Sequence, residues 1–338
     1  MLRRGVRVLS AAGRAWATTG LFLAAIVLGS ALGAWAPGPA GVVAGWTDPL
    51  ILLLVAALFF TLPLDGLAAL RRAPRTAAIA LGLNFLVVPA LAVALTSLLP
   101  DPAVRLGVLI YCLAPCTDWF LGFTRLVGGD TTTGAALVPL QLTAQLLLYP
   151  LWLSLFAGDQ GAATASSAGP ALLTWFVLPA AVGLGARLVL RLSVPSARRV
   201  RVVAAADRAV PGLIAAVIAT IFAGNVGTIL ADPGTVGWVL LVVFLFFVAT
   251  YALGEAVARV FRLRRPEQAL VTMTTSARNA PLMLAVTTVA LPNEPVVHAA
   301  IILGMLVEFP HLTVLTHLLR RRRPPQEHHT ARTEVMSR

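Results

Sequence analysis

Ten long apolar runs follow one another along the 338 residues of the chain, and they constrain its fold more than any other feature. Each run approaches the roughly 20 residues that an α-helix needs to span a bilayer. Charged residues make up only 12% of the chain, whereas a soluble domain contains about 25%. The sequence therefore predicts an all-α polytopic membrane protein. Its ten transmembrane helices are expected at roughly 17–36, 48–67, 77–99, 103–127, 134–157, 169–192, 209–230, 235–260, 267–291 and 295–319.

The basic residues, all of them Arg, alternate between successive connections. They cluster at the N-terminus and after every second apolar run. The other connections carry acidic residues, with Arg105 as the one basic exception. These acidic residues are Asp48, Asp101, Asp159, Asp232 and Glu294. This is the positive-inside pattern. It predicts that both termini are cytoplasmic and that the protein lies in the plasma (inner) membrane of a bacterium. The first run also resembles a secretory signal, but its length favours a retained helix.

Two unlike charges, Asp118 and Arg278, lie deep inside apolar runs. Each stands about a dozen residues from the start of its run, which is close to mid-membrane at about 1.5 Å per residue. Pro115 and Pro281 stand beside them, and proline removes a backbone donor and favours a break. We therefore expect the fourth and ninth helices to be discontinuous. Their free main-chain groups would be tolerated only beside protein or a cavity.

The two charges lie 160 positions apart, and the same offset brings Pro150 onto Pro310. With this offset the first five helices correspond to the last five. Because each half has an odd number of helices, the second half crosses the membrane in the opposite orientation. The sequence predicts two inverted five-helix repeats, 1–160 and 161–323, joined through an Arg-rich connection at 188–208. A disordered cytoplasmic tail is expected at 324–338. In transporters of this plan, discontinuous helices meet near the midplane, so helices 4 and 9 are expected to cross.

Two stretches resemble the arsenical-resistance-3 type of arsenite permease: Cys112 through Asp130, and Ser276 through Pro310. Both halves resemble, more broadly, the bile acid:sodium symporter superfamily. That resemblance implies ten helices in two inverted repeats. It also implies a panel domain of helices 1, 2, 6 and 7, and a core domain in which broken helices 4 and 9 cross.

The permease resemblance assigns roles to Cys116 and Glu308. Cys116 would be a metalloid ligand, because soft thiolates select thiophilic centres. Cys112, one helical turn earlier, would be a weaker second ligand, although a buried Cys also serves as a small hydrophobic residue. Glu308 would load and release a proton, because intramembrane acids commonly act in proton relays. The alternative for Glu308 is a protonated side chain that bonds to a neighbouring helix.

The expected substrate site combines polar residues of the two breaks with helix 5: Cys116, Thr117, Asp118, Arg278, Asn279 and Gln145. Asp118, also a candidate proton site, forms with Arg278 either a structural salt bridge or a switchable pair. The segment from Arg278 to Pro281 departs from the Asn-Asn-Phe-Glu-like segment of the permeases. Thr274 and Arg278 stand near the places where sodium-coupled relatives carry an acid and a Gln. A guanidinium is always charged, so Arg278 would replace a sodium ion electrostatically.

Other polar residues of the apolar runs are expected to be hydrogen-bond partners between helices: Asn84, Glu255, Gln141, Asn225, Thr131 to Thr133, Asp65 and Tyr149. His311 and His317 are expected at the membrane interface. The sequence contains no metal-ligand spacing, phosphate-binding loop, dinucleotide fingerprint or nucleophile elbow. It therefore predicts neither an enzyme nor a cofactor.

The sequence favours a secondary-active transporter that exports arsenite or antimonite in exchange for protons. Its partners would be the substrate, H⁺ rather than Na⁺, and the lipid bilayer, with no role for nucleic acid. The alternative is a sodium- or proton-coupled symporter of an organic anion held by Arg278. A receptor or scaffold built on a transporter fold is disfavoured, because the chain has no sizeable soluble segment.

Overall fold

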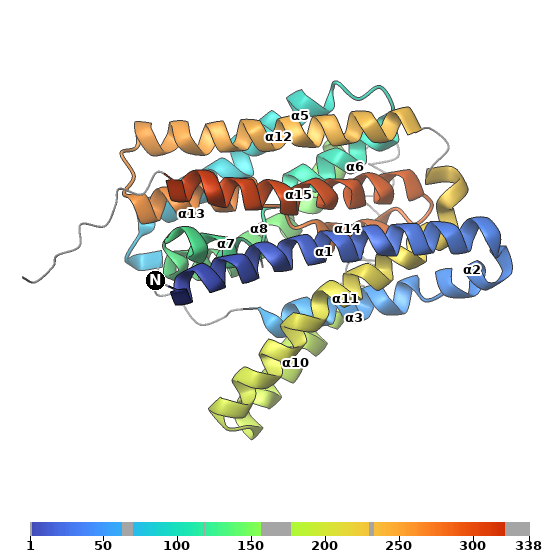
Figure 1. The fold of residues 1–338 in the computed structure, drawn as a ribbon, viewed down its shortest axis with the longest axis horizontal. Coiled ribbons are helices and arrows are strands. Elements are labelled where there is room, and N and C mark those ends of the chain that lie inside the picture. The colour runs from blue at the N-terminus through green and yellow to red at the C-terminus, as the bar shows by residue number, and fades with distance from the viewer. Residues whose placement is uncertain (1, 63–69, 118, 157–176, 230–232, 322–338) are drawn as a thin grey trace, which may run out of the picture.

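In the computed structural model the chain forms a bundle of helices that run mostly side by side (Figure 1). The structure describes residues 2–62, 70–117, 119–156, 177–229 and 233–321. In these ranges the regular structure is helical, and one isolated bridge is the only β-type pairing. The elements, of which η2 is a π-helix, are α1 (Leu2–Trp35), α2 (Pro37–Ala44), α3 (Thr47–Thr61), α4 (Pro74–Gly82), η2 (Leu83–Val87), α5 (Val88–Thr96), α6 (Pro102–Leu113), α7 (Trp119–Val127), α8 (Thr131–Phe156), α10 (Leu178–Ser193), α11 (Ser196–Ile229), α12 (Pro233–Val260), α13 (Arg265–Ser276), α14 (Ala280–Ala290) and α15 (Pro295–Arg321).

Six helical segments of the described residues are long and apolar enough to cross a membrane: Pro37–Thr61, Pro74–Thr96, Thr131–Phe156, Ser196–Gly227, Gly234–Val260 and Pro295–Arg321. Three shorter apolar helices accompany them, at Gly20–Trp35, Pro102–Leu113 and Ala280–Ala290. The prediction of a helical membrane protein is confirmed. Ten helices in two inverted repeats stay a prediction, and residues 157–176, where the sixth helix was expected to begin, lie outside the described ranges. So does the expected tail, 324–338.

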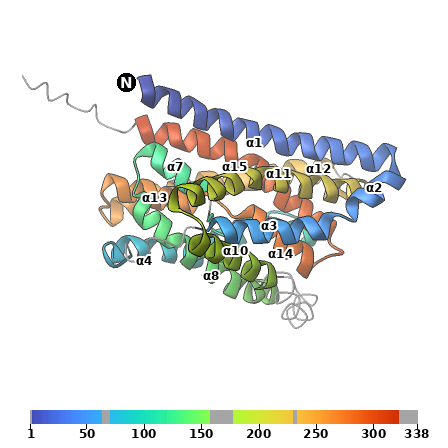
Figure 2. The same ribbon diagram turned by 90° about the horizontal axis from the view of Figure 1, so that it is seen from below.

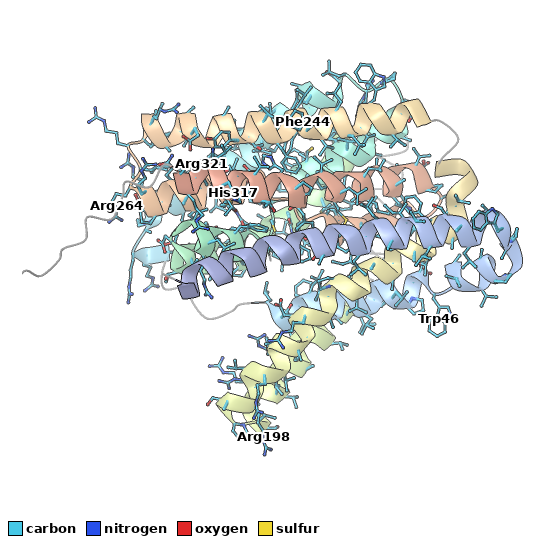
Figure 3. All side chains as sticks on the ribbon, viewed as in Figure 1. Trp46, Arg198, Phe244, Arg264, His317 and Arg321 are labelled. Atoms are coloured by element: carbon cyan, nitrogen blue, oxygen red, sulfur yellow. The ribbon has the colours of Figure 1, made fainter. Side chains whose placement is uncertain are left out.

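The prediction of a connection at 188–208 is wrong, because most of these residues are helical. Helix α10 continues to Ser193 and α11 begins at Ser196. Pro195 between them cannot continue the first helix, so the chain reverses within two residues. Arg198 lies at the tip of this hairpin, which projects from the bundle (Figure 3). The Arg residues assigned to a loop therefore extend two helices.

Small residues let four helices approach closely. A Cβ on Gly29 of α1 would come within 2.5 Å of the carbonyl oxygen of Ala219 in α11, and one on Gly33 within 2.6 Å of that of Ala223. This is the small-xxx-small packing of membrane helices. Gly183 of α10 likewise packs against the backbone of α3 at Ala56. Helices α1, α3, α10 and α11 therefore form one packed group, which matches the panel expected from helices 1, 2, 6 and 7.

The second group packs around α15. Gly107 of α6 lies against α15, where an added Cβ would be 2.6 Å from the carbonyl oxygen of Val297. Gly254 of α12 lies against Thr272 of α13 in the same way. Helices α1 and α15 run side by side in both ribbon views, so α1 also joins the two groups (Figure 2). Arg264 and Arg321 lie at one end of the bundle and Trp46 at the other (Figure 3).

Candidate functional site

Two helices break where the sequence places a proline beside a charge. Helix α6 ends at Leu113, and α7 begins at Trp119. Helix α13 ends at Ser276, and α14 begins at Ala280. Ala114 and Ala277, which follow α6 and α13, have extended backbone dihedral angles. The predicted discontinuities are confirmed.

The two breaks pair with each other through their main chains. The amide of Cys116 donates to the carbonyl oxygen of Ala277 over 3.1 Å, and the amide of Asn279 donates to that of Ala114 over 2.9 Å. Together they form an antiparallel bridge centred on Pro115 and Arg278. Main-chain groups deep in a membrane protein must find partners inside the protein. The pairing supplies those partners and holds the broken helices against each other, in a contact that we call the crossing.

Arg278 is fully buried at the crossing, with 0% of its surface exposed. Its Nη1 donates to the carbonyl oxygen of Cys112 over 2.9 Å. Its Nη2 donates to Asn84 Oδ1 over 3.2 Å and to the carbonyl oxygens of Thr274 and Thr275. Four neutral oxygens therefore surround the guanidinium.

Helix ends supply three of these four oxygens. Cys112 belongs to the last turn of α6, and Thr274 and Thr275 to the last turn of α13. The last carbonyls of a helix lack intrahelical donors and carry the negative end of its dipole. The ring of Phe246 in α12 lies 5.5 Å from the guanidinium carbon, within range of a cation–π interaction. The cation is thus held by two half-helix C-termini, one amide and one aromatic ring.

The expected pairing of Arg278 with Asp118 concerns a residue outside the described ranges. Within them, the two ion pairs join Arg259 to Glu255 and Arg264 to Glu267, and neither includes Arg278. The oxygen cage is therefore the environment that the structure describes for this charge. Whether Asp118 is a structural or a switching partner stays a prediction.

Glu308 of α15 bonds directly to the second break. Its Oε1 accepts the backbone amide of Arg278 over 3.0 Å, and its Oε2 accepts the hydroxyl of Tyr111 over 3.3 Å. The side chain is 1% exposed. Gly304 leaves room for the Tyr111 ring, since an added Cβ would lie 2.8 Å from two of its atoms. Glu308 therefore links α6, α13–α14 and α15 at one point.

A cavity of about 200 Å³ lies beside the crossing. Thr117 and Asn279 line it from the two breaks, and Asn279 Nδ2 donates to Thr117 Oγ1 over 2.9 Å. Asp207 of α11 also lines it. The remaining lining residues come from α3 and its C-terminal end, α7, α8 and α14: Leu58, Phe59, Thr61, Leu62, Leu121, Leu142 and Leu282. The cavity thus separates the crossing from the packed group of α3 and α11.

The other predicted ligands do not line this cavity. Cys116 and Cys112 are buried, at 0% and 1% exposure. Gln145 of α8 is also buried, and neither polar atom of its side chain has a hydrogen-bond partner among the described residues. It lies nearly one turn beyond Leu142, which does line the cavity. Of the six predicted substrate-site residues, the structure brings only Thr117 and Asn279 to the cavity wall, while Asp118 lies outside the described ranges.

Four of the secondary candidates join helices. Asn84 Nδ2 and Gln141 Nε2 both donate to Thr274 Oγ1, over 3.4 and 2.9 Å. Tyr149 donates to Thr287 over 3.0 Å. Glu255 accepts Gln268 over 2.8 Å. These contacts confirm the predicted hydrogen bonds between helices.

The remaining secondary candidates bond locally or lie elsewhere. Thr133 bonds to Asp130 at the start of α8, and Asn225 bonds to the carbonyl oxygen of Ile221 within α11. Asp65 lies outside the described ranges. His311 was expected at the interface but stacks on Phe247 with ring centroids 4.4 Å apart, because it shares the inward face of α15 with Glu308. His317 is exposed.

Sequence reasoning missed three residues of the site. Tyr111 and Phe246 are aromatic residues inside apolar runs, where nothing in the sequence marks them as neighbours of a charge. Asp207 was assigned to the Arg-rich connection, although it lies about three turns inside α11. The described residues contain no group of three or more His, Cys, Asp or Glu side chains able to hold a metal ion.

Residues 49–232 match the family described as Sodium Bile acid symporter family. The match begins within α3, includes the first break and the cavity residue Asp207, and ends before α12. Arg278 and Glu308 lie beyond it. No curated protein matches the chain significantly.

Proposed function

Since the chain belongs to the sodium bile acid symporter family, whose members are transporters and not enzymes, we propose that it is a secondary-active transporter with its substrate site in the cavity beside the crossing. The observation that carries this proposal is that both breaks contribute to the cavity wall, through Thr117 and Asn279. Ligand sites of such carriers lie where discontinuous helices meet. A relative movement of α3 and α11 against the crossing would then open the cavity to alternate sides.

We propose that Arg278 takes the place of a coupling cation. Four oxygens surround its guanidinium, and oxygen ligands also suit hard metal cations. A side chain that is always charged and tethered to the protein cannot dissociate with the substrate. In this proposal the guanidinium replaces a coupled sodium ion at this place. Glu308, which is hydrogen-bonded to Arg278, is the proposed proton site.

The metalloid hypothesis names arsenite or antimonite as the substrate, exported in exchange for protons, with Cys116 as the ligand. Cys116 directly precedes the cavity residue Thr117, but its thiol is buried. A rearrangement of the crossing would have to expose it. Everted vesicles containing the wild-type protein should then accumulate arsenite, and those containing Cys116→Ser should not. Equal accumulation by both would remove the thiol mechanism.

The second candidate, symport of an organic anion, draws on the family description, which names sodium and bile acid. In that alternative, Arg278 binds the anion. The guanidinium is fully buried and is not among the cavity residues. Binding of the anion by Arg278 therefore also requires the crossing to rearrange. Arg278→Gln should then weaken the affinity for taurocholate, and unchanged affinity would exclude the role.

Filling the cavity tests the proposed site for any substrate. Leu142→Trp places a larger side chain in the cavity wall, whereas Leu147→Trp on the same helix changes a side chain that is 74% exposed. Transport of arsenite and taurocholate would be measured in vesicles for both variants. We expect Leu142→Trp to abolish the transport that the wild type shows, and Leu147→Trp to retain it. Full transport by Leu142→Trp would contradict the site.

A further inference from the structure

The tip of the α10–α11 hairpin, residues 188–203, concentrates positive charge. Four Arg residues lie there: Arg191 in α10, and Arg198, Arg199 and Arg201 in α11. Arg199 Nη1 donates to the carbonyl oxygen of Arg191 over 3.4 Å, which joins the two helices at the tip. No Asp or Glu occurs in the tip, and neither ion pair of the described residues includes one of these Arg side chains. The tip therefore carries four positive charges and no acid.

The same tip exposes large apolar side chains. Leu192 of α10 is 77% exposed and Val200 of α11 is 66% exposed, and Leu188 and Val189 are exposed as well. Water disfavours exposed apolar surface of this kind, and hydrocarbon disfavours the neighbouring guanidinium groups. The boundary between lipid headgroups and acyl chains suits both. There, apolar side chains contact the acyl chains while Arg side chains extend to the headgroups.

The length of α11 brings its Arg-rich end to such a boundary. Its 34 residues extend over about 51 Å at 1.5 Å per residue, whereas the hydrocarbon layer is about 30 Å thick. Arg198 lies at the tip of the hairpin, on the side of the molecule where Arg264 and Arg321 lie and away from Trp46 (Figure 3). The distribution of Arg predicts that this side is cytoplasmic. Anionic lipids of the cytoplasmic leaflet attract basic segments.

The chemistry of the tip favours a lipid over two other occupants. A second copy of the chain would bring the same Arg residues to this surface, and like charges repel. A soluble anion would bind the guanidinium groups but would leave the apolar side chains exposed. An anionic phospholipid supplies a phosphate, which Arg binds through two parallel hydrogen bonds, and acyl chains that cover the apolar surface.

We propose that the hairpin tip is a binding site for an anionic phospholipid. Its phosphate lies among the Arg side chains of α10 and α11, and its acyl chains contact the neighbouring apolar side chains. The site is separate from the cavity beside the crossing, because no residue of the tip lines that cavity. The bound lipid would hold the group of α1, α3, α10 and α11 at the membrane surface. The inference does not depend on which substrate the protein transports.

Native mass spectrometry of the purified full chain in a neutral detergent tests the site. The probes are dioleoylphosphatidylglycerol and dioleoylphosphatidylcholine, which have identical acyl chains and differ in net charge. One basic residue near an anionic lipid surface strengthens binding roughly fivefold. The wild type should therefore bind phosphatidylglycerol at least about fivefold more tightly than phosphatidylcholine.

Replacing exposed Arg residues of the tip locates the site. A variant that combines Arg191→Gln, Arg198→Gln and Arg201→Gln should lose the preference, because it removes three exposed charges and keeps Arg199, which joins the helices. The corresponding triple Lys variant should retain the preference, because it keeps the charges.

A matched control removes the same charge elsewhere. Arg71→Gln, Arg72→Gln and Arg321→Gln also change exposed residues, and their combination should retain the preference. Thermal unfolding of each variant would show that the changes leave the fold intact.

Four results would overturn the inference. They are equal binding of the two lipids by the wild type, an unchanged preference in the triple Gln variant of the tip, a preference lost equally in the control variant, and displacement of the lipid by inorganic phosphate. The last result would assign the Arg residues to a soluble anion. A lipid-free dimer that the triple Gln variant no longer forms would instead assign the surface to a second copy of the chain.

Discussion

Replacing Glu308 separates a structural role from a proton-transfer role. Glu308→Gln keeps a carbonyl oxygen for the backbone amide of Arg278, and its new NH₂ group can donate to the Tyr111 oxygen. Glu308→Ala removes both partners and leaves the buried amide of Arg278 without an acceptor. Such a loss costs about 1–3 kcal/mol, and the space left by the side chain adds a cavity cost. We therefore expect Glu308→Ala to lower the free energy of unfolding by at least about 2 kcal/mol and Glu308→Gln by less than about 1 kcal/mol.

Titration of the purified protein with sodium dodecyl sulfate would measure both free energies. Transport driven by a proton gradient would be measured in vesicles made from the same preparations. Glu308→Gln should fold like the wild type and yet lose proton-driven transport, because an amide does not titrate. If Glu308→Gln is as unstable as Glu308→Ala, the hydrogen-bonding role of the side chain is contradicted. If Glu308→Gln retains proton-driven transport, the assignment of the proton site is refuted.

Two further changes test the contacts around the site. Gly304→Ala places a Cβ about 2.8 Å from the ring of Tyr111, so the ring must move. We expect the free energy of unfolding to fall by about 1–3 kcal/mol, as measured by the same titration. An unchanged free energy of unfolding would contradict the packing of Gly304 against Tyr111. Tyr149→Phe removes the 3.0 Å hydrogen bond to Thr287 and should cost about 0.5–1.5 kcal/mol without changing transport. A loss of transport at equal stability would instead indicate that Tyr149 contacts the substrate.

The sequence predicted the breaks because their cause is local. A proline within a run of several polar residues favours a break in a helix, so the residues near Pro115 and Pro281 could be identified without the fold. Proline alone is not enough, since Pro139, Pro150 and Pro310 lie inside continuous helices. The same holds for Asn84 and Gln141, because an amide in lipid must bond to another helix. Their shared partner, Thr274, was not predictable, since it depends on how α4–α5, α8 and α13 lie together.

The surroundings of Arg278 could not be read from the sequence. A buried charge suggests a countercharge, and Asp118 was the natural candidate. Three of the four described contacts are instead main-chain carbonyl oxygens, which every residue possesses and which become available where helices end. Asp207 was missed for the opposite reason, because a charged residue among many Arg residues resembled part of a loop. Both cases depend on where α6, α11 and α13 begin or end.

The response of the wild-type protein to sodium tests most directly whether Arg278 replaces a coupling cation. Thermal unfolding and transport would be compared in sodium and potassium chloride at equal ionic strength. A sodium ion present at 100 times its dissociation constant would stabilise the protein by about 2.7 kcal/mol. We predict equal stability and equal transport in the two salts, because the guanidinium already occupies the oxygen cage. A sodium-specific stabilisation of that size, or transport that requires sodium, would contradict the account.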